Sequence, residues 1–197
     1  MKKKIAILGS TGSIGKTTFN ILRQNKKKFN VIVLTTNKNA NEILKQAKIL
    51  NVKNVIIQSK NNYLKLEKKF KKNNIKVHFN LKSLKKIIKK KIDYTMCSIT
   101  GLAGMKPTMD AIEFSNTVGI ANKESIICAW SIIKKKLRKF KTKFIPIDSE
   151  HFSIWSLIKN ENINNINQII ITASGGPFLN KSISKIKNVK PREAVKH

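Results

Sequence analysis

Short apolar runs alternate along the chain with longer segments in which apolar residues recur at helical spacing. The apolar runs, which we predict to be strands, are residues 4–8, 29–34, 54–58, 92–98, 117–121, 143–147 and 168–172. The predicted helices are residues 40–50, 63–72, 83–90, 107–114, 126–133 and 152–158, after a first helix that carries Ile14, Thr18, Ile21 and Leu22. This alternation indicates an α/β fold with a parallel sheet covered on both faces. Ligands of such sheets bind beyond the carboxyl ends of the strands, so the segments that follow the strands are the candidate sites.

The first strand runs into a turn that contains Gly9, Gly12 and Gly15. Glycines at this spacing allow a sharp turn, close approach of a pyrophosphate and tight packing of helix on strand, which is typical of a dinucleotide site. Backbone N–H groups and the positive end of the helix dipole then face the phosphate. Two alternatives stay open: a turn without ligand, and a P-loop, whose motif also ends in Gly-Lys-Thr but requires glycine where Ser10 stands.

The second strand ends in small polar residues at positions 35–39. An NAD site usually carries an Asp or Glu here to bind the ribose 2′-hydroxyl, and none is present. The missing acid and the presence of Lys38 favour NADP, whose 2′-phosphate is anionic. Lys38 alone carries little weight, because lysine is abundant throughout the chain.

Polar clusters follow two later strands, at residues 122–125 and 148–151. Each has a structural interpretation as a helix N-cap, with Asn122 as the capping residue of the first cluster and Asp148 or Ser149 as that of the second. If strand geometry continues past residue 147, Asp148 and Glu150 point to one side, roughly 7 Å apart, close enough for one divalent cation. Carboxylates suit Mg²⁺ or Mn²⁺ and do not make a closed zinc site of thiolates and imidazoles. The pattern supports the metal site and the helix cap equally.

The last predicted strand is followed by Ala-Ser-Gly-Gly-Pro-Phe at residues 173–178. Ser174 beside two glycines offers a hydroxyl and backbone N–H groups to an anion, and a turn without ligand is the alternative. Between the predicted elements, residues 160–167 form a polar loop. Residues 190–197 have the composition of the opening turn of a helix.

The chain has 197 residues, 41% of them hydrophobic, which suffices for one full domain and part of a second. Its formal net charge of +31 raises the possibility of a nucleic-acid-binding module. However, the lysines are spread along the whole chain, and arginine occurs only as Arg23, Arg138 and Arg192. Lysine, asparagine and isoleucine share A/T-rich codons. We therefore attribute the charge to genome composition and expect no specific nucleic-acid surface.

No apolar run approaches the length of a bilayer span, and the amino terminus lacks the pattern of a signal peptide. We therefore expect a cytoplasmic protein, of bacterial type, without a membrane partner. Cys97 and Cys128 are far apart and lack the spacing of metal ligands, so we expect both to be buried free thiols.

Four segments together resemble the 1-deoxy-D-xylulose 5-phosphate reductoisomerase family: residues 9–15, 121–125, 146–151 and 172–178. The resemblance extends over residues 4–197 in order and in spacing. It implies an NADPH enzyme of the non-mevalonate isoprenoid route that works as a homodimer on a sugar phosphate. Its reaction is a metal-assisted rearrangement, followed by hydride reduction to 2-C-methyl-D-erythritol 4-phosphate. The metal implied is Mg²⁺ or Mn²⁺, with Co²⁺ as a further option.

The resemblance also implies roles for individual residues. The cofactor pyrophosphate is assigned to Thr11, Gly12, Ser13 and Ile14, and the adenosine end to Asn37, Lys38 and Asn39. Asn122 and Glu124 are assigned to NADPH, and Lys123, Ser149, Glu150 and Ser174 to the substrate. Asp148 and Glu150 are assigned to the metal, and the catalytic residues are Lys123, Asp148 and Glu150.

The implied architecture is a Rossmann-like NADPH-binding domain at residues 1–147, followed by the start of an α/β catalytic domain at residues 148–197. Two departures concern Trp130 and Asn37, which stand where the family usually has glycine. Because family members are about twice as long as this chain, we expect an N-terminal fragment that at most binds NADPH.

Overall fold

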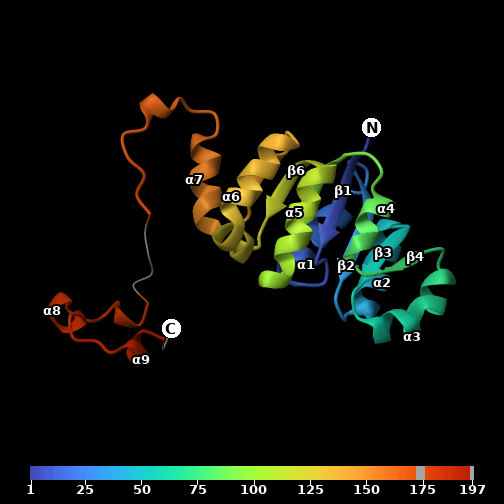
Figure 1. The fold of residues 1–197 in the computed structure, drawn as a ribbon, viewed down its shortest axis with the longest axis horizontal. Coiled ribbons are helices and arrows are strands. Elements are labelled where there is room, and N and C mark those ends of the chain that lie inside the picture. Colours follow the sequence, from blue (N-terminus) through green and yellow to red (C-terminus); the bar gives the residue numbers. More distant parts are fainter. Residues whose placement is uncertain (172–175, 196–197) are drawn as a thin grey trace. The chain divides into compact units, whose positions relative to one another are not determined.

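A computed structural model describes residues 1–171 and 176–195 (Figure 1). The chain divides into two compact units, Met1–Trp155 and Ser156–His197. The first unit contains the sheet and most of the helices, and the second contains short helical turns. The predicted boundary between a cofactor domain and a catalytic domain at residue 147 stays a prediction.

Among the described residues, seven strands form one parallel sheet in the order β4-β3-β2-β1-β5-β6-β7. Their bounds are β1 (Lys3–Leu8), β2 (Phe29–Thr36), β3 (Asn54–Ile57), β4 (Lys76–Phe79), β5 (Ile92–Cys97), β6 (Ser115–Ile120) and β7 (Lys143–Pro146). The strand order reverses between β1 and β5, the position at which ligands of doubly wound sheets bind. The predicted α/β, Rossmann-like fold is confirmed.

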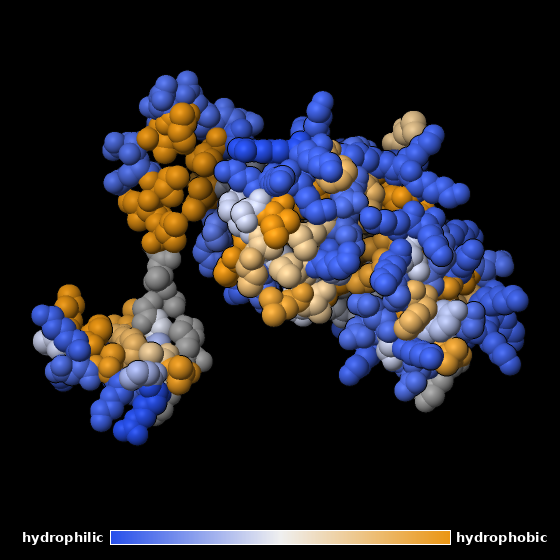
Figure 2. Space-filling model, viewed as in Figure 1, coloured by the Kyte–Doolittle hydropathy of each residue, from blue (hydrophilic) through white to orange (hydrophobic). Residues whose placement is uncertain are grey.

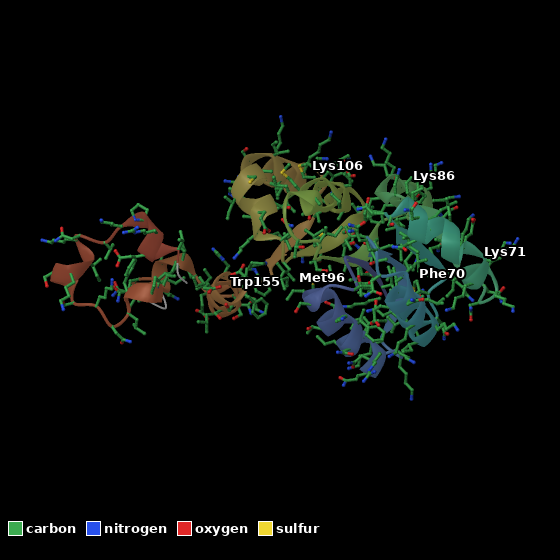
Figure 3. The ribbon with its side chains drawn as sticks, turned by 90° about the horizontal axis from the view of Figure 1, so that it is seen from below. Phe70, Lys71, Lys86, Met96, Lys106 and Trp155 are labelled. Carbon is green, nitrogen blue, oxygen red and sulfur yellow. The ribbon has the colours of Figure 1, made fainter. Side chains whose placement is uncertain are left out.

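The helices of the first unit cover both faces of this sheet. They are α1 (Ser13–Gln24), α2 (Ala40–Leu50), α3 (Lys60–Lys71), α4 (Leu84–Ile87), α5 (Met105–Phe114) and α6 (Lys123–Lys139), with 3₁₀ turns η1 (Leu81–Ser83) and η2 (Leu102–Gly104). Helix α7 (Ser149–Ile158) follows β7 and spans the boundary between the two units. One buried cluster joins the sheet to α1, α2 and α3, and a second joins it to α4, α5 and α6. Phe70 of α3 lies in the first cluster, whereas Lys71, Lys86 and Lys106 are exposed (Figure 3).

Two strand predictions need correction. Strand β4 was not predicted, because its sequence Lys-Val-His-Phe is only four residues long and half polar. It lies at the edge of the sheet, and no residue of the strand is fully buried. The predicted strand at 168–172 is wrong over residues 168–171, which are irregular, and residue 172 lies outside the described residues. Ile169, Ile170 and Ile171 are 49–73% exposed, so this run has the composition of a strand without a neighbouring strand to pair with. The helix predicted at 83–90 is reduced to η1 and the single turn α4.

The prediction of two buried thiols is confirmed for Cys97 and wrong for Cys128. Both are free, but Cys128 is exposed, because α6 turns Ser125, Ala129 and Ile133 towards the core at intervals of one helical turn. Burial raises the pKa of Cys97 to about 12.

Helix α6 also departs from helical geometry at Ala129, with φ −135° and ψ 23°, next to Trp130. The Trp130 ring packs on Phe144 of β7, with 5.8 Å between centroids.

The second unit contains η3 (Ile163–Asn165), η4 (Gly176–Phe178), α8 (Ile183–Ile186) and α9 (Pro191–Ala194). Glu193 accepts a hydrogen bond from the backbone N–H of Lys190, 3.0 Å, and pairs with Lys181 at 2.9 Å. The predicted loop at 160–167 and the helix start near residue 190 are confirmed.

Hydrophilic side chains are spread over the visible face of the first unit, as expected for dispersed lysines (Figure 2). None of the helices in the described residues combines the length and the apolar character that crossing a bilayer requires.

Candidate cofactor and metal site

The loops that carry the predicted site residues of the first unit lie along one edge of the sheet. They follow β1, β2, β6 and β7, and all of these strands run parallel. Loops far apart in the sequence are therefore brought to the carboxyl edge, where ligands of such sheets bind.

The three glycines of the first loop differ in what their lack of a side chain permits. Gly9 has φ +84°, and a Cβ on it would stand 2.8 Å from the carbonyl oxygen of Ser98. A Cβ on Gly15 would stand 2.2 Å from the carbonyl oxygen of Gly9, so α1 packs directly on the loop. A Cβ on Gly12 would meet that same oxygen at 3.5 Å, an ordinary contact. The fold thus requires Gly9 and Gly15, whereas Gly12 leaves the outer surface of the loop open.

The amino terminus of α1 has no side-chain cap. Gly12 is its N-cap residue and makes no side-chain hydrogen bond, whereas Asn39 caps α2 and Asn122 caps α6. The first-turn N–H groups of an uncapped helix need acceptors from elsewhere, and an anion supplies them. The exposed residues Ser13 and Ile14 begin this turn. The arrangement fits the pyrophosphate of a dinucleotide.

The glycine loop is fixed from both sides by the neighbouring strands. The backbone N–H of Gly9 donates to the hydroxyl of Thr35, and that of Ser10 donates to the carbonyl of Thr35, each at 2.9 Å. On the other side the hydroxyl of Ser98 donates to the carbonyl of Leu8, 2.8 Å. The Thr11 hydroxyl lies 2.7 Å from that of Thr36. Such a loop presents its N–H groups in one fixed arrangement.

The loop after β2 contains Asn37, Lys38 and Asn39, all exposed. Asn39 accepts a hydrogen bond from the backbone N–H of Glu42, 3.2 Å, and so caps α2. The carbonyl of Lys38 accepts from the side chain of Asn62, 2.8 Å. No acidic residue lies between the end of β2 and the start of α2, so no carboxylate of this loop would repel a 2′-phosphate.

Asn122 is 2% exposed and uses its whole side chain inside the protein. Its Oδ1 accepts from the N–H and the hydroxyl of Ser125 at 2.6 and 2.5 Å. Its Nδ2 donates to the carbonyl of Gly101, 2.8 Å, and to that of Ile99. A carboxamide has two donor hydrogens and two acceptor positions, so none is left for a cofactor. The N-cap interpretation is confirmed, and a contact to NADPH would have to come from the backbone.

The two residues after Asn122 are more exposed to solvent than Asn122 itself. Lys123 is exposed at the first position of α6, and Glu124 is half-buried in its first turn. A lysine in this position can reach an anionic substrate at the carboxyl edge, whereas the carboxylate of Glu124 interacts favourably with the helix dipole.

The loop after β7 does not continue as a strand. β7 ends at Pro146 and α7 begins at Ser149, so the expected strand spacing of Asp148 and Glu150 is wrong. Asp148 Oδ1 accepts a hydrogen bond from the backbone N–H of His151 at 2.8 Å. The same oxygen lies 2.7 Å from the ring Nδ1 of His151. This is the predicted helix N-cap.

The carboxylates of Asp148 and Glu150 nevertheless have the chemistry of a cation site. The Ser149 hydroxyl donates to Glu150 at 2.8 Å, and this hydrogen bond lowers the pKa of Glu150. Magnesium binds to one or two carboxylates and completes its shell with water and substrate oxygens. Among the described residues no group of three or more His, Cys, Asp or Glu that could hold a metal ion gathers.

Ser174 lies outside the described residues. Conversely, the structure identifies residues that hold the glycine loop and that the sequence did not single out. Thr35 and Ser98 are polar residues at the ends of apolar strands, which is the signal that could have found them. Gln46 lies in the middle of α2 and gave no such signal.

A cavity of about 550 Å³ opens elsewhere, at the amino ends of β1, β5 and β6. Its lining includes Lys3, Phe29, Asp93 and Asn116 and none of the predicted site residues. The cavity lies on the same face of the sheet as α1, α2 and α3. It is therefore separate from the candidate site at the carboxyl edge.

Comparisons with known proteins identify the family of the chain. Residues 5–130 match the family model of 1-deoxy-D-xylulose 5-phosphate reductoisomerase, and residues 144–197 match the model of its C-terminal domain. The reductoisomerase of Pelagibacter ubique is 53% identical over 197 residues, which are 99% of this chain and 51% of the relative. That of Caldanaerobacter subterraneus is 36% identical and is also covered to 51%.

Solved structures are similar as well. The Zymomonas mobilis enzyme in complex with NADPH has 34% identity and a TM-score of 0.86 over 100% of this chain and 52% of that one. A reductoisomerase in complex with NADPH, fosmidomycin and magnesium has 30% identity and a TM-score of 0.79, over 99% of this chain and 51% of that one. The chain thus spans about half the length of the relatives it matches.

Proposed function

The chain belongs to the 1-deoxy-D-xylulose 5-phosphate reductoisomerase family, and we propose that it carries the NADPH-binding part of that activity. The activity is the conversion of 1-deoxy-D-xylulose 5-phosphate to 2-C-methyl-D-erythritol 4-phosphate in non-mevalonate isoprenoid synthesis. Residues 1–147 are the NADPH-binding domain, and residues 148–197 begin the catalytic domain. The sugar phosphate is the substrate, and the whole enzyme is a cytoplasmic homodimer.

The observation that carries the proposal is the open amino terminus of α1. It lies at the point where the strand order reverses, it has no side-chain cap, and Gly12 keeps its outer surface accessible. Thr11, Gly12, Ser13 and Ile14 line the pyrophosphate site there, and the backbone N–H groups of Thr11, Ser13 and Ile14 donate to it, because that of Gly12 donates to the carbonyl of Gly9 at 3.1 Å. The loop at Asn37, Lys38 and Asn39 binds the adenosine end, and the absence of an acid favours NADPH over NADH.

When bound, NADPH would supply the hydride, whereas a divalent cation, Mg²⁺, Mn²⁺ or Co²⁺, would polarise the substrate carbonyl. The chain's own residues position these groups. Asn122 holds the loop after β5 against α6, so that Lys123 and Glu124 project from a fixed helix start towards substrate and cofactor. Asp148 and Glu150 contribute two carboxylates to the cation, and Ser149 and Ser174 donate to the substrate.

A pair of glycine substitutions tests cofactor binding. In Gly12→Ala the new methyl group makes only ordinary contacts inside the protein but projects where the pyrophosphate would approach. We expect a melting temperature close to that of the original chain and a loss of NADPH affinity of at least about tenfold, the equivalent of one good hydrogen bond. Isothermal titration of the 197-residue chain with NADPH measures this.

Gly15→Ala serves as the matched control. Its methyl group meets the Gly9 carbonyl at 2.2 Å, so it lowers the melting temperature whether or not a ligand binds. Failure of the original chain to bind NADPH would contradict the proposal, as would unchanged affinity in Gly12→Ala. Thermal stabilisation by ATP and Mg²⁺ but not by NADPH would instead support a P-loop nucleotide hydrolase.

A further inference from the structure

Gln46 of α2 is an unusual core residue. Its side chain is fully buried among apolar neighbours of α2. Of the described residues, Gln46 is also the one with a buried side-chain polar atom, Oε1, that has no hydrogen-bond partner. An unpaired buried carboxamide oxygen costs stability, and packing alone would favour an apolar residue here.

The other half of the carboxamide contacts the glycine loop. Gln46 Nε2 donates to the carbonyl oxygen of Ser10 at 3.0 Å and to Glu42 Oε1 at 3.1 Å. Both partners are acceptors, so they fix the orientation of the amide. The N–H of Ser10 already donates to the carbonyl of Thr35. Ser10, itself fully buried, is thus held by β2 on one side and by α2 on the other.

The same hydrogen bonds connect the two loops assigned to NADPH. The Ser10 carbonyl and the Thr11 N–H belong to one peptide group, and the next residue, Gly12, is the N-cap of α1. Gln46 joins Ser10 to Glu42, and the backbone N–H of Glu42 is capped by Asn39, in the loop assigned to the adenosine end. The path therefore runs from the pyrophosphate loop through α2 to the adenosine loop.

We propose that Gln46 is a positioning residue for the cofactor: it fixes the Ser10 carbonyl, and with it the N–H groups that bind the pyrophosphate, while Glu42 orients its amide. The inference rests on the proposed NADPH site. Gln46 costs stability at a position where an apolar residue would pack better. Such violations of local packing rules are expected at functional sites.

Gln46→Met tests the inference, because methionine has a similar shape and no hydrogen-bonding amide. It removes the bond to Ser10 together with the unpaired oxygen. Because the Ser10 carbonyl loses its donor while the unpaired oxygen disappears, the two effects on stability oppose each other, and we expect a melting temperature close to that of the original chain. We expect the NADPH dissociation constant to rise about tenfold, as for one lost hydrogen bond. Leu44→Met, at a buried position of the same helix, is the control and leaves the affinity unchanged.

Glu42 offers a second pair of variants that leaves the core intact. Glu42→Gln keeps an oxygen that accepts from Gln46, so NADPH affinity stays near its original value. Glu42→Ala removes the acceptor and lowers the affinity. A role of Glu42 in helix stability alone would instead lower the melting temperature of Glu42→Ala without changing the dissociation constant.

A measurement without cofactor separates this inference from the proposed function. Hydrogen exchange of the backbone amides of residues 10–13 in the free chain should accelerate in Gln46→Met and not in Leu44→Met. If the original chain fails to bind NADPH, the proposed function is wrong, and the exchange rates still decide whether Gln46 positions the loop. Unchanged exchange and unchanged affinity in Gln46→Met overturn the inference.

Discussion

The hydroxyl oxygen of Tyr94 on β5 lies 1.8 Å from the point where a Cβ of Gly119 on β6 would stand. The ring therefore lies across the neighbouring strand, in space that exists because residue 119 has no side chain. Burial raises the pKa of Tyr94 well above its ordinary value. The central sheet thus contains a glycine that serves packing, in contrast to Gly12 at the site.

Gly119→Ala should accordingly destabilise the protein by about 1–3 kcal/mol, the usual cost of overpacking a core. Urea unfolding measures the loss. Combining it with Tyr94→Phe removes the nearest clashing atom, so the double variant should be less destabilised than the sum of the single variants. Strict additivity would show that the two residues do not interact.

Asn122→Ala should lower the free energy of unfolding by more than the loss of an ordinary helix cap does. The substitution removes the cap of α6 and also leaves the carbonyls of Ile99 and Gly101 without their donor. We expect a loss of roughly 2–4 kcal/mol, against about 1 kcal/mol for Asn39→Ala, which removes an exposed cap. Equal losses in urea unfolding would show that the loop after β5 does not depend on Asn122.

Glu113 should contribute a pH-dependent part of the stability. It lies 2.5 Å from Lys136 and 3.2 Å from Lys85, and the hydrogen bond from Lys136 is the main cause of its lowered pKa. Because the unfolded carboxyl has the higher pKa, its contribution is present at neutral pH and is lost as the pH falls below 4.5 towards the folded value.

In Glu113→Gln this loss on acidification should be absent. Urea unfolding at a series of pH values between neutrality and acid compares the variant with the original chain. A variant that loses stability with falling pH as steeply as the original would refute the role of Glu113.

Asp148 should act both as a helix cap and as a cation ligand. Asp148→Asn keeps an oxygen for the N–H of His151 but loses the charge, so α7 should remain stable while binding of Mn²⁺ weakens. Asp148→Ala should lose both properties. Circular dichroism follows the helix, and electron paramagnetic resonance of free Mn²⁺ follows binding. Mn²⁺ affinity equal to that of the original chain in both variants would remove Asp148 from the metal site.

Asn37→Asp should reduce the preference for NADPH over NADH. The residue is exposed at the end of β2, and a carboxylate there would repel the 2′-phosphate and accept from a ribose hydroxyl. We expect NADPH affinity to fall roughly five- to tenfold, as for about 1 kcal/mol of repulsion between partly hydrated charges. Asn20→Asp, exposed on α1, makes the same change of charge and should leave the ratio of affinities unaltered.

The chain itself determined the fold class and the place of the site. The apolar run from Ile5 to Leu8 is buried as a strand, because burial of apolar surface is the main favourable contribution to the free energy of folding. The glycine turn and the polar segments after the strands carried local signals of caps and anion sites. These properties depend on residues near one another in sequence, which is why they could be predicted.

Tertiary structure decided everything that depends on distant neighbours. It made β4 a strand by pairing it with β3, and it left Ile169 to Ile171 unpaired and irregular. It engaged the amide of Asn122 with the carbonyls of Ile99 and Gly101, and it brought the amide of Gln46 to the carbonyl of Ser10. Hydrogen bonds and strand pairs require partners from elsewhere in the chain, so only the folded structure shows which polar groups remain free for a ligand.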